Sequence, residues 1–135
     1  MQRALFESGE LSLFVFARWL VSEAEFLREA PVQPHEMRVL GVGINPLDMR
    51  RVDVAVDLTA CTEPVKVEMV IVGPDDDELC SLLLVENRTW MIDKIMHLRR
   101  DAQPGEYVLH VGVFYEDELV TRAARRFAFP LSQVV

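Results

Sequence analysis

The regular alternation of apolar and polar side chains from about Met37 to the C-terminus limits the fold of this chain more than any other feature. The clearest example is residues 51–58, RVDVAVDL, where apolar side chains occupy every second position and three of the four positions between them are charged. Successive side chains of a β-strand point to opposite faces of a sheet. This segment therefore predicts a strand with one face buried and the other in water.

This part of the chain contains seven such segments, most of them separated by turn residues. The turns contain Asn45-Pro46, Glu63-Pro64, Gly73-Pro74-Asp75 and the segments 101–105 and 116–118. We expect strands at residues 38–44, 52–58, 65–71, 78–86, 90–99 and 107–115, and in a last segment that ends with Phe127 and Phe129. Seven short strands at this spacing are typical of an antiparallel β-sandwich. Strands do not alternate with long helices, which disfavours a parallel α/β sheet.

One segment resembles a known family. Residues 101–107, DAQPGEY, followed by the alternating VLHVGVFY, resemble the start of the sixth strand in immunoglobulin-like and fibronectin-III-like domains. In that family a tyrosine near the start of this strand bonds back to the backbone upstream, and Tyr107 is the candidate for this "tyrosine corner". The resemblance covers roughly residues 36–130 and implies a seven-stranded antiparallel immunoglobulin-like β-sandwich.

The two cysteines bear on the same resemblance. The family often carries a disulfide between its second and sixth strands, but neither Cys61 nor Cys80 lies on the sixth predicted strand. Two cysteines are also too few for a disulfide scaffold. We therefore expect two reduced thiols in a cytoplasmic protein.

The N-terminal region has a different pattern. Residues 10–30 contain no Gly or Pro, end directly before Pro31, and carry apolar side chains at helical spacing on one face. Further apolar residues lie off that face, so the helix would be apolar nearly all round, although its first part also has strand character. The predicted architecture is mainly β: an N-terminal helical segment at 1–34 with one apolar α-helix, followed by a sandwich domain at 35–135.

The start of the chain does not resemble a secretory signal, because Glu7 and Glu10 accompany Arg3 and no small-residue cleavage site follows. Its apolar stretch, Leu11 to Val21, is interrupted by Arg18 and falls short of the ~20 residues that span a bilayer. A net charge of −8 disfavours nucleic acid or an anionic membrane as partner. These observations predict a cytoplasmic location.

No group of residues has both the chemistry and the spacing of a known catalytic or cofactor site, so we predict neither an enzyme nor a bound cofactor. The histidines His97 and His110 fall on outward positions of strands that belong to opposite sheets in the resembled fold, which disfavours a shared metal. The acidic run 75–78 has the oxygen ligands of a calcium loop, but four consecutive residues more often form a solvated turn. The segment 41–43, GVG, is only half of a dinucleotide fingerprint.

Three arginines near the C-terminus, Arg122, Arg125 and Arg126, stand out in an acidic chain. Neighbouring strand residues point to opposite sides, so either Arg125 or Arg126 should lie against the edge of the core. The cluster could pair with the acidic residues at 116–118. It could also form a docking patch for an acidic segment of a partner.

The leading functional hypothesis is a non-catalytic interaction module that acts as a homodimer. If the N-terminal helix packs on the sandwich by one face, its remaining aromatic residues would form an exposed patch that a second copy could cover. These interface candidates are Phe14, Phe16, Trp19 and Phe26. The alternative is a binder of a small apolar ligand, in a pocket between helix and sandwich lined by Phe14, Trp19, Trp90 and Met96.

Overall fold

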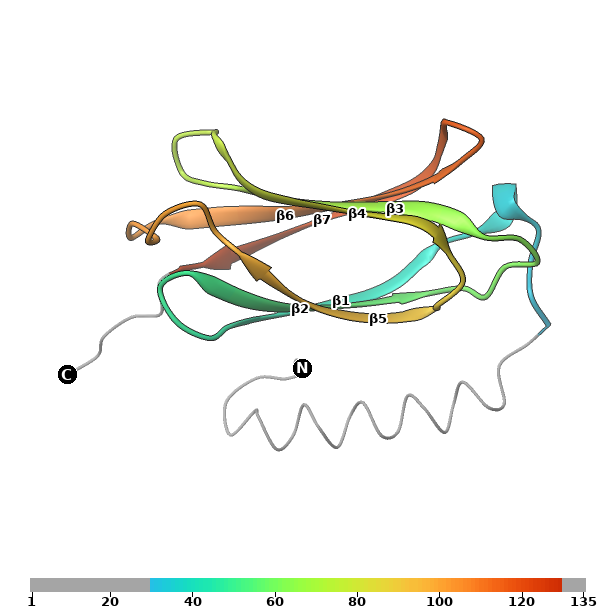
Figure 1. Ribbon diagram of the computed structural model, residues 1–135, viewed down its shortest axis with the longest axis horizontal. Helices are drawn as coiled ribbons and strands as arrows, with labels where there is room; N and C mark the ends of the chain where they lie inside the picture. Colours follow the sequence, from blue (N-terminus) through green and yellow to red (C-terminus); the bar gives the residue numbers. More distant parts are fainter. Residues whose placement is uncertain (1–29, 130–135) are drawn as a thin grey trace.

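Residues 30–129 are described by a computed structural model of the chain, and this part is mainly β (Figure 1). Seven strands form two antiparallel sheets that stack as the layers of a β-sandwich. The described residues contain no α-helix, and the predicted helix at 10–30 falls, apart from its last residue, outside them.

The seven predicted strands are confirmed. Every strand boundary that the sequence predicted lies within two residues of the observed boundary. The elements are η1 (Pro34–Glu36), a short 3-10 helix, and the strands β1 (Val39–Pro46), β2 (Arg51–Leu58), β3 (Val65–Val72), β4 (Glu78–Asn87), β5 (Met91–His97), β6 (Glu106–Tyr115) and β7 (Glu118–Ala128). One sheet has the order β1-β2-β5, and the other has the order β4-β3-β6-β7. Each sheet therefore contains strands that are distant in the sequence.

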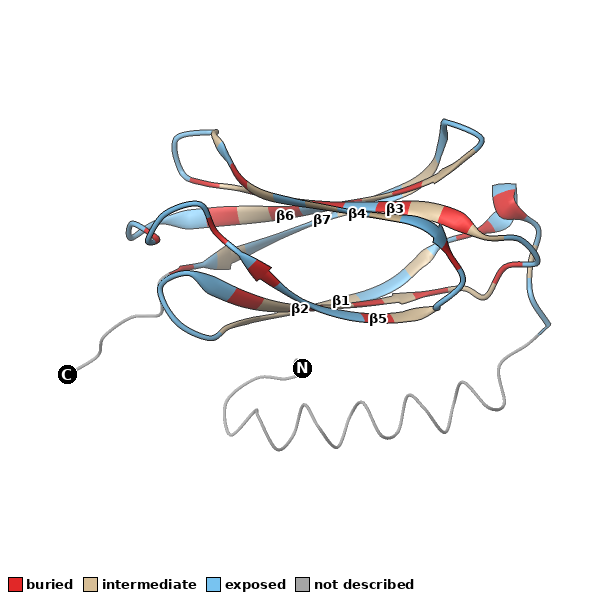
Figure 2. Ribbon diagram, viewed as in Figure 1, coloured by how far each residue is buried: buried red, intermediate tan, exposed pale blue. Residues whose placement is uncertain are grey.

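The core lies between the two layers, where every second residue of the central strands is buried (Figure 2). The alternation predicted for residues 51–58 is confirmed, and β3 and β6 repeat it. Val54 of β2 and Val111 of β6 have exposed fractions of 0% and 1%. Burial of apolar side chains from both sheets contributes most of the favourable free energy that holds such a sandwich together.

Tyr107 anchors the loop before β6 to the core. Its hydroxyl group donates a hydrogen bond to the carbonyl oxygen of Gln103 at 2.6 Å and accepts one from the Gln103 N–H at 2.8 Å. The ring is buried and packs edge-on against Phe129, with ring centroids 5.5 Å apart. The hydroxyl thus bonds back to the upstream backbone, as a tyrosine corner requires.

The two cysteines are unbridged in this structure: Cys61 is buried and Cys80 is half-buried. Trp90 lies directly before β5, half-buried against the core. Within residues 30–129, no helix has the length and apolar character needed to cross a membrane.

Candidate functional site

The outward surfaces of the two sheets differ in character. On the three-stranded sheet, the outward positions of β2 carry Arg51, Asp53, Ala55 and Asp57, the polar pattern expected of a face in water. On the four-stranded sheet, many outward positions carry apolar side chains instead. We call this surface the apolar face and define it by Val70, Val72, Leu83, Phe114 and Leu119.

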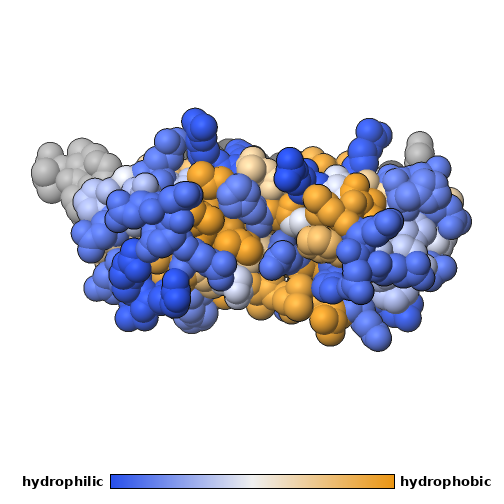
Figure 3. Space-filling view, turned by 90° about the horizontal axis from the view of Figure 1, so that it is seen from above, coloured by the Kyte–Doolittle hydropathy of each residue, from blue (hydrophilic) through white to orange (hydrophobic). Residues whose placement is uncertain are grey.

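The apolar face is visible as a hydrophobic area over the middle of the molecule, with hydrophilic residues toward both ends (Figure 3). Leu83 on the edge strand β4 and Leu119 on the edge strand β7 are exposed, at 53% and 48%. Val70, Val72 and Phe114 are half-buried. A face of this kind leaves apolar side chains in contact with water, which is unusual for the outer surface of a sandwich.

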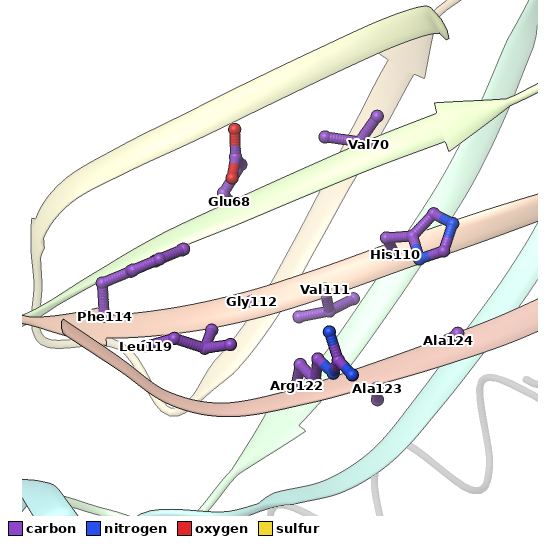
Figure 4. Close-up of a pocket in the computed structure, with 10 residues that line it drawn as sticks. All are labelled: Glu68, Val70, His110, Val111, Gly112, Phe114, Leu119, Arg122, Ala123 and Ala124. Carbon is purple, nitrogen blue, oxygen red and sulfur yellow. The ribbon is translucent and has the colours of Figure 1, made fainter. Parts of the chain in front are cut away.

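The strand register places three residues in one row across this face. Glu68 of β3 pairs with Gly112 of β6, and Gly112 pairs in turn with Arg122 of β7. Glu68 and Arg122 therefore stand on either side of a glycine that has no side chain (Figure 4). The next row along the strands consists of Val70, His110 and Ala124.

A shallow hollow with a volume of about 550 Å³ lies over Gly112 and its neighbours. Its walls include Glu68, Val70, His110, Phe114, Leu119 and Arg122. A Cβ atom placed on Gly112 would lie 3.1 Å from Cε1 of Phe114 and 3.5 Å from Cδ1 of Leu119. The Phe114 ring and Leu119 thus lean over the glycine, and a larger side chain there would displace them.

The hollow is lined by apolar side chains together with one exposed acidic and one exposed basic side chain. Glu68 and Arg122 are both exposed, and within residues 30–129 neither side chain forms an ion pair. His110, also exposed, adds a polar group beside them. This arrangement can offer van der Waals contacts together with two charged hydrogen-bonding groups to whatever covers it.

The three arginines of β7 divide between the two sides of the sheet. Arg122 and Arg126 pair across the sheet with the outward-facing positions of β6, whereas Arg125 pairs with the buried Leu109. Arg125 donates a hydrogen bond to the carbonyl oxygen of Val42 at 2.7 Å. The cluster predicted from the sequence is therefore not one continuous patch.

The expected pairing of these arginines with the acidic turn at 116–118 is not seen among the described residues. Asp117 pairs instead with Lys66, with its Oδ1 3.1 Å from Nζ. Arg122 is thus the member of the predicted cluster that lines the hollow.

Other predicted residues lie elsewhere. His97 on β5 and His110 on β6 are both exposed, as expected from the alternation, and they lie in different sheets, as the resembled fold implies. In the acidic turn, Arg100 pairs with Asp77, and this hydrogen bond holds the pKa of Asp77 below its ordinary value. In the described part of the chain, no group of three or more His, Cys, Asp or Glu residues is arranged to hold a metal ion.

The residues expected to line an apolar-ligand pocket are only partly described. Met96 has an exposed fraction of 2% and lies in the core, and Trp90 is half-buried beside that core. Phe14 and Trp19 lie outside the described residues, as do the other interface candidates Phe16 and Phe26. That pocket therefore stays a prediction.

The hollow itself was not predicted from the sequence. The sequence does contain an indication of an apolar outer surface. Apolar residues lie on both faces of β4, and β3 ends in a continuous apolar run, Met69 to Val72. The row formed by Glu68, Gly112 and Arg122 depends on which strands pair, and the sequence pattern does not supply that.

No protein-family model matches the chain, and comparison with curated proteins finds no match. Among solved structures, the chain resembles part of a glycosyl hydrolase family 2 member from Bacteroides cellulosilyticus DSM 14838, with a TM-score of 0.53 and 12% identity over 68% of this chain. A second structure of a family 2 member from Bacteroides cellulosilyticus matches with a TM-score of 0.52 and 13% identity, also over 68% of this chain. The match spans only 15% and 14% of those two chains. At such low identity the likeness concerns the fold alone, and that fold is the β-sandwich.

Proposed function

We propose that this chain is a non-catalytic interaction module built on an immunoglobulin-like sandwich, and that its docking surface is the apolar face of the four-stranded sheet. The tyrosine-corner hydrogen bonds of Tyr107 and the seven antiparallel strands in two layers support the immunoglobulin-like assignment. Because sandwiches of this kind host many functions, the surface rather than the fold carries the functional argument.

The observation that carries the proposal is the apolar character of an outward sheet surface. Leu83 and Leu119 are about half exposed on opposite edges of the four-stranded sheet, with Val70 and Phe114 between them. Contiguous apolar surface of this kind commonly marks an interaction site, because burying it removes it from water. The outward positions of β2 in the other sheet contrast with this surface, because three of the four carry charged side chains.

The shape of the surface favours a protein partner over a small molecule. Small-molecule sites enclose about 70–90% of the ligand surface. The hollow over Gly112 is shallow and lies on an open sheet, so it would leave a small ligand largely in water. A second flat surface could cover the hollow and its apolar surroundings together, and Glu68 and Arg122 would then fix the orientation of that surface.

Site-specific photo-cross-linking tests the proposal. A benzophenone amino acid at Leu119, which is 48% exposed on the apolar face, should cross-link to a protein in cells that produce the full chain. The matched control is Ile95 on the outer side of the three-stranded sheet, 49% exposed. Cross-links that are equally frequent from both positions, or absent from Leu119, would contradict the proposal.

We place this module in the cytoplasm. The two unbridged cysteines, Cys61 and Cys80, support a reducing compartment. Alkylation of protein taken directly from cells, without added reductant, should modify both thiols once the chain is unfolded. A disulfide-linked species in that experiment would contradict this location.

A further inference from the structure

We infer that the partner of the apolar face is a second copy of this chain, bound face to face about a two-fold axis that runs parallel to β6 above Gly112. This inference rests on the proposed function and names the occupant of the same surface. It depends on the row formed by Glu68, Gly112 and Arg122.

The positions of the charges make the face complementary to itself. Glu68 lies one strand to one side of Gly112, and Arg122 lies one strand to the other side. A two-fold axis along β6 turns the second copy over and exchanges these two sides. Glu68 of each copy then faces Arg122 of the other copy, so one contact generates two identical ion pairs, as an isologous interface requires.

The charges also select this axis over the other simple arrangement. An axis at right angles to the strands, in the same interface plane, would set Glu68 opposite Glu68 and Arg122 opposite Arg122. Facing like charges destabilise an interface by several kcal/mol. The axis along β6 is the one that pairs opposite charges and still brings the apolar side chains around Phe114 of the two copies together.

The area of the apolar face indicates the kind of dimer to expect. Four strands about 4.8 Å apart, with eight residues each at about 3.3 Å, cover an area of roughly 500 Å² per copy. Two such faces together bury roughly 1,000 Å², near the lower limit for a specific interface. Interfaces at this lower limit are typical of weak or transient complexes, so we expect a reversible dimer rather than a permanent one.

Sedimentation velocity of the full chain from about 1 µM to several hundred µM tests the inference, with a monomer–dimer equilibrium as the expected result. Glu68→Arg and Arg122→Glu should each raise the dissociation constant at least about tenfold, because each places like charges opposite one another. The double variant Glu68→Arg/Arg122→Glu should associate like the original chain.

Mixing the two single variants provides the sharpest test. One carries two basic residues at these positions and the other carries two acidic residues, so an equimolar mixture should form heterodimers with an affinity close to that of the original chain. This recovery would also show that both variants are folded. The controls Asp93→Arg and Arg38→Glu make the same changes of charge at exposed positions on or beside the three-stranded sheet, and they should leave the dissociation constant unchanged.

Two results would overturn the second copy as partner. One is a chain that stays monomeric over the whole concentration range, and the other is a dimer that is insensitive to Glu68→Arg and Arg122→Glu. If the chain is monomeric while Leu119 cross-links to a different protein, the interaction module stands and only its self-association fails. If Leu119 forms no cross-link at all, both proposals fail.

Discussion

Arg125 donates a hydrogen bond from its guanidinium Nη1 to the carbonyl oxygen of Val42, with the two atoms 2.7 Å apart. The two residues belong to β7 and β1, which are edge strands of different sheets. The bond therefore joins the two layers along one open side of the sandwich. It also satisfies one backbone acceptor on an edge strand, where an unpaired group could otherwise accept a partner strand.

Arg125→Ala should lower the free energy of unfolding by about 1 kcal/mol, since it removes a hydrogen bond between a charged donor and a carbonyl at an exposed site. Arg122→Ala is the matched control, because the Arg122 side chain forms no ion pair within residues 30–129 and should change that free energy by less than about 0.5 kcal/mol. Urea unfolding at a concentration where the chain is monomeric measures both. Equal effects of the two variants would show that the bond to Val42 does not hold the layers together.

Tyr107→Phe keeps the buried ring and removes the hydroxyl group, leaving the N–H and the carbonyl of Gln103 without this partner. We expect a loss of about 1–2 kcal/mol, which corresponds to a decrease of roughly 4–16 °C in the melting temperature of a domain of this size. Tyr115→Phe is the control, because its hydroxyl group meets Glu63 at the exposed surface and its loss should matter less. A thermal melt that shows no larger effect for Tyr107 would contradict the structural role of the corner.

The prediction of the fold succeeded where burial on one face imposes a period of two. Residues 51–58 show this. They form β2, the central strand of its sheet, where edges and bulges rarely disturb the alternation of side chains. The tyrosine corner could be predicted because a tyrosine after a Pro-Gly turn bonds to residues only four positions upstream. Both features depend on local spacing.

The proposed docking surface could not be predicted in the same way, because it depends on long-range pairing. Glu68 and Gly112 are neighbours only because β3 pairs with β6, and the turn residues of the chain do not specify that connection. The split between Arg125 and Arg126 follows from alternation alone, but the acceptor of Arg125 lies on β1, 83 residues away in the sequence. The predicted pairing with residues 116–118 failed because Asp117 meets Lys66 on β3 instead.

We expect the free energy of unfolding to decrease in acid, and Asp77 should account for part of this decrease. The hydrogen bond from Arg100 lowers the pKa of Asp77 in the folded protein below its ordinary value of 3.8. This carboxylate therefore stabilises the fold above about pH 4, and the contribution is lost as the pH falls through the lower, folded-state pKa.

In Asp77→Asn, the free energy of unfolding should consequently decrease less between about pH 5 and pH 2 than in the original chain. At neutral pH the variant should be less stable than the original chain. Urea unfolding at several pH values checks this. Asp75→Asn removes a carboxylate of the same turn that forms no ion pair within the described residues, and it should leave the pH dependence closer to that of the original chain. Identical pH curves for Asp77→Asn and the original chain would rule out this contribution.

A side chain at Gly112 should weaken self-association and leave the fold intact. In Gly112→Val the new side chain would meet Phe114 and Leu119, and it would separate Glu68 and Arg122 from the opposing copy. Valine suits a strand, so the backbone itself should tolerate the change. We expect at least a tenfold higher dissociation constant by sedimentation velocity. Gly41→Val on β1, where a Cβ atom would meet nothing within 4 Å, should have no such effect.

Lys94 should hinder the addition of further strands to the edge strand β5. It pairs with the buried Val54, and its neighbours Ile92 and Met96 at the same parity are each 2% exposed, so Lys94 occupies an inward position on an edge. A charged residue at such a position blocks the addition of another strand, because a new neighbour would bury its ammonium group.

Lys94→Val should therefore have two opposite effects. The additional apolar contact with the core should maintain or raise the free energy of unfolding, by up to about 1 kcal/mol. The edge would at the same time become continuous and apolar, so the variant should aggregate faster than the original chain when both are incubated below the melting temperature and followed by light scattering. Lys94→Arg keeps the charge and should behave like the original chain. If Lys94→Val stays as soluble as Lys94→Arg, protection of the β5 edge must come from its short length rather than from the lysine.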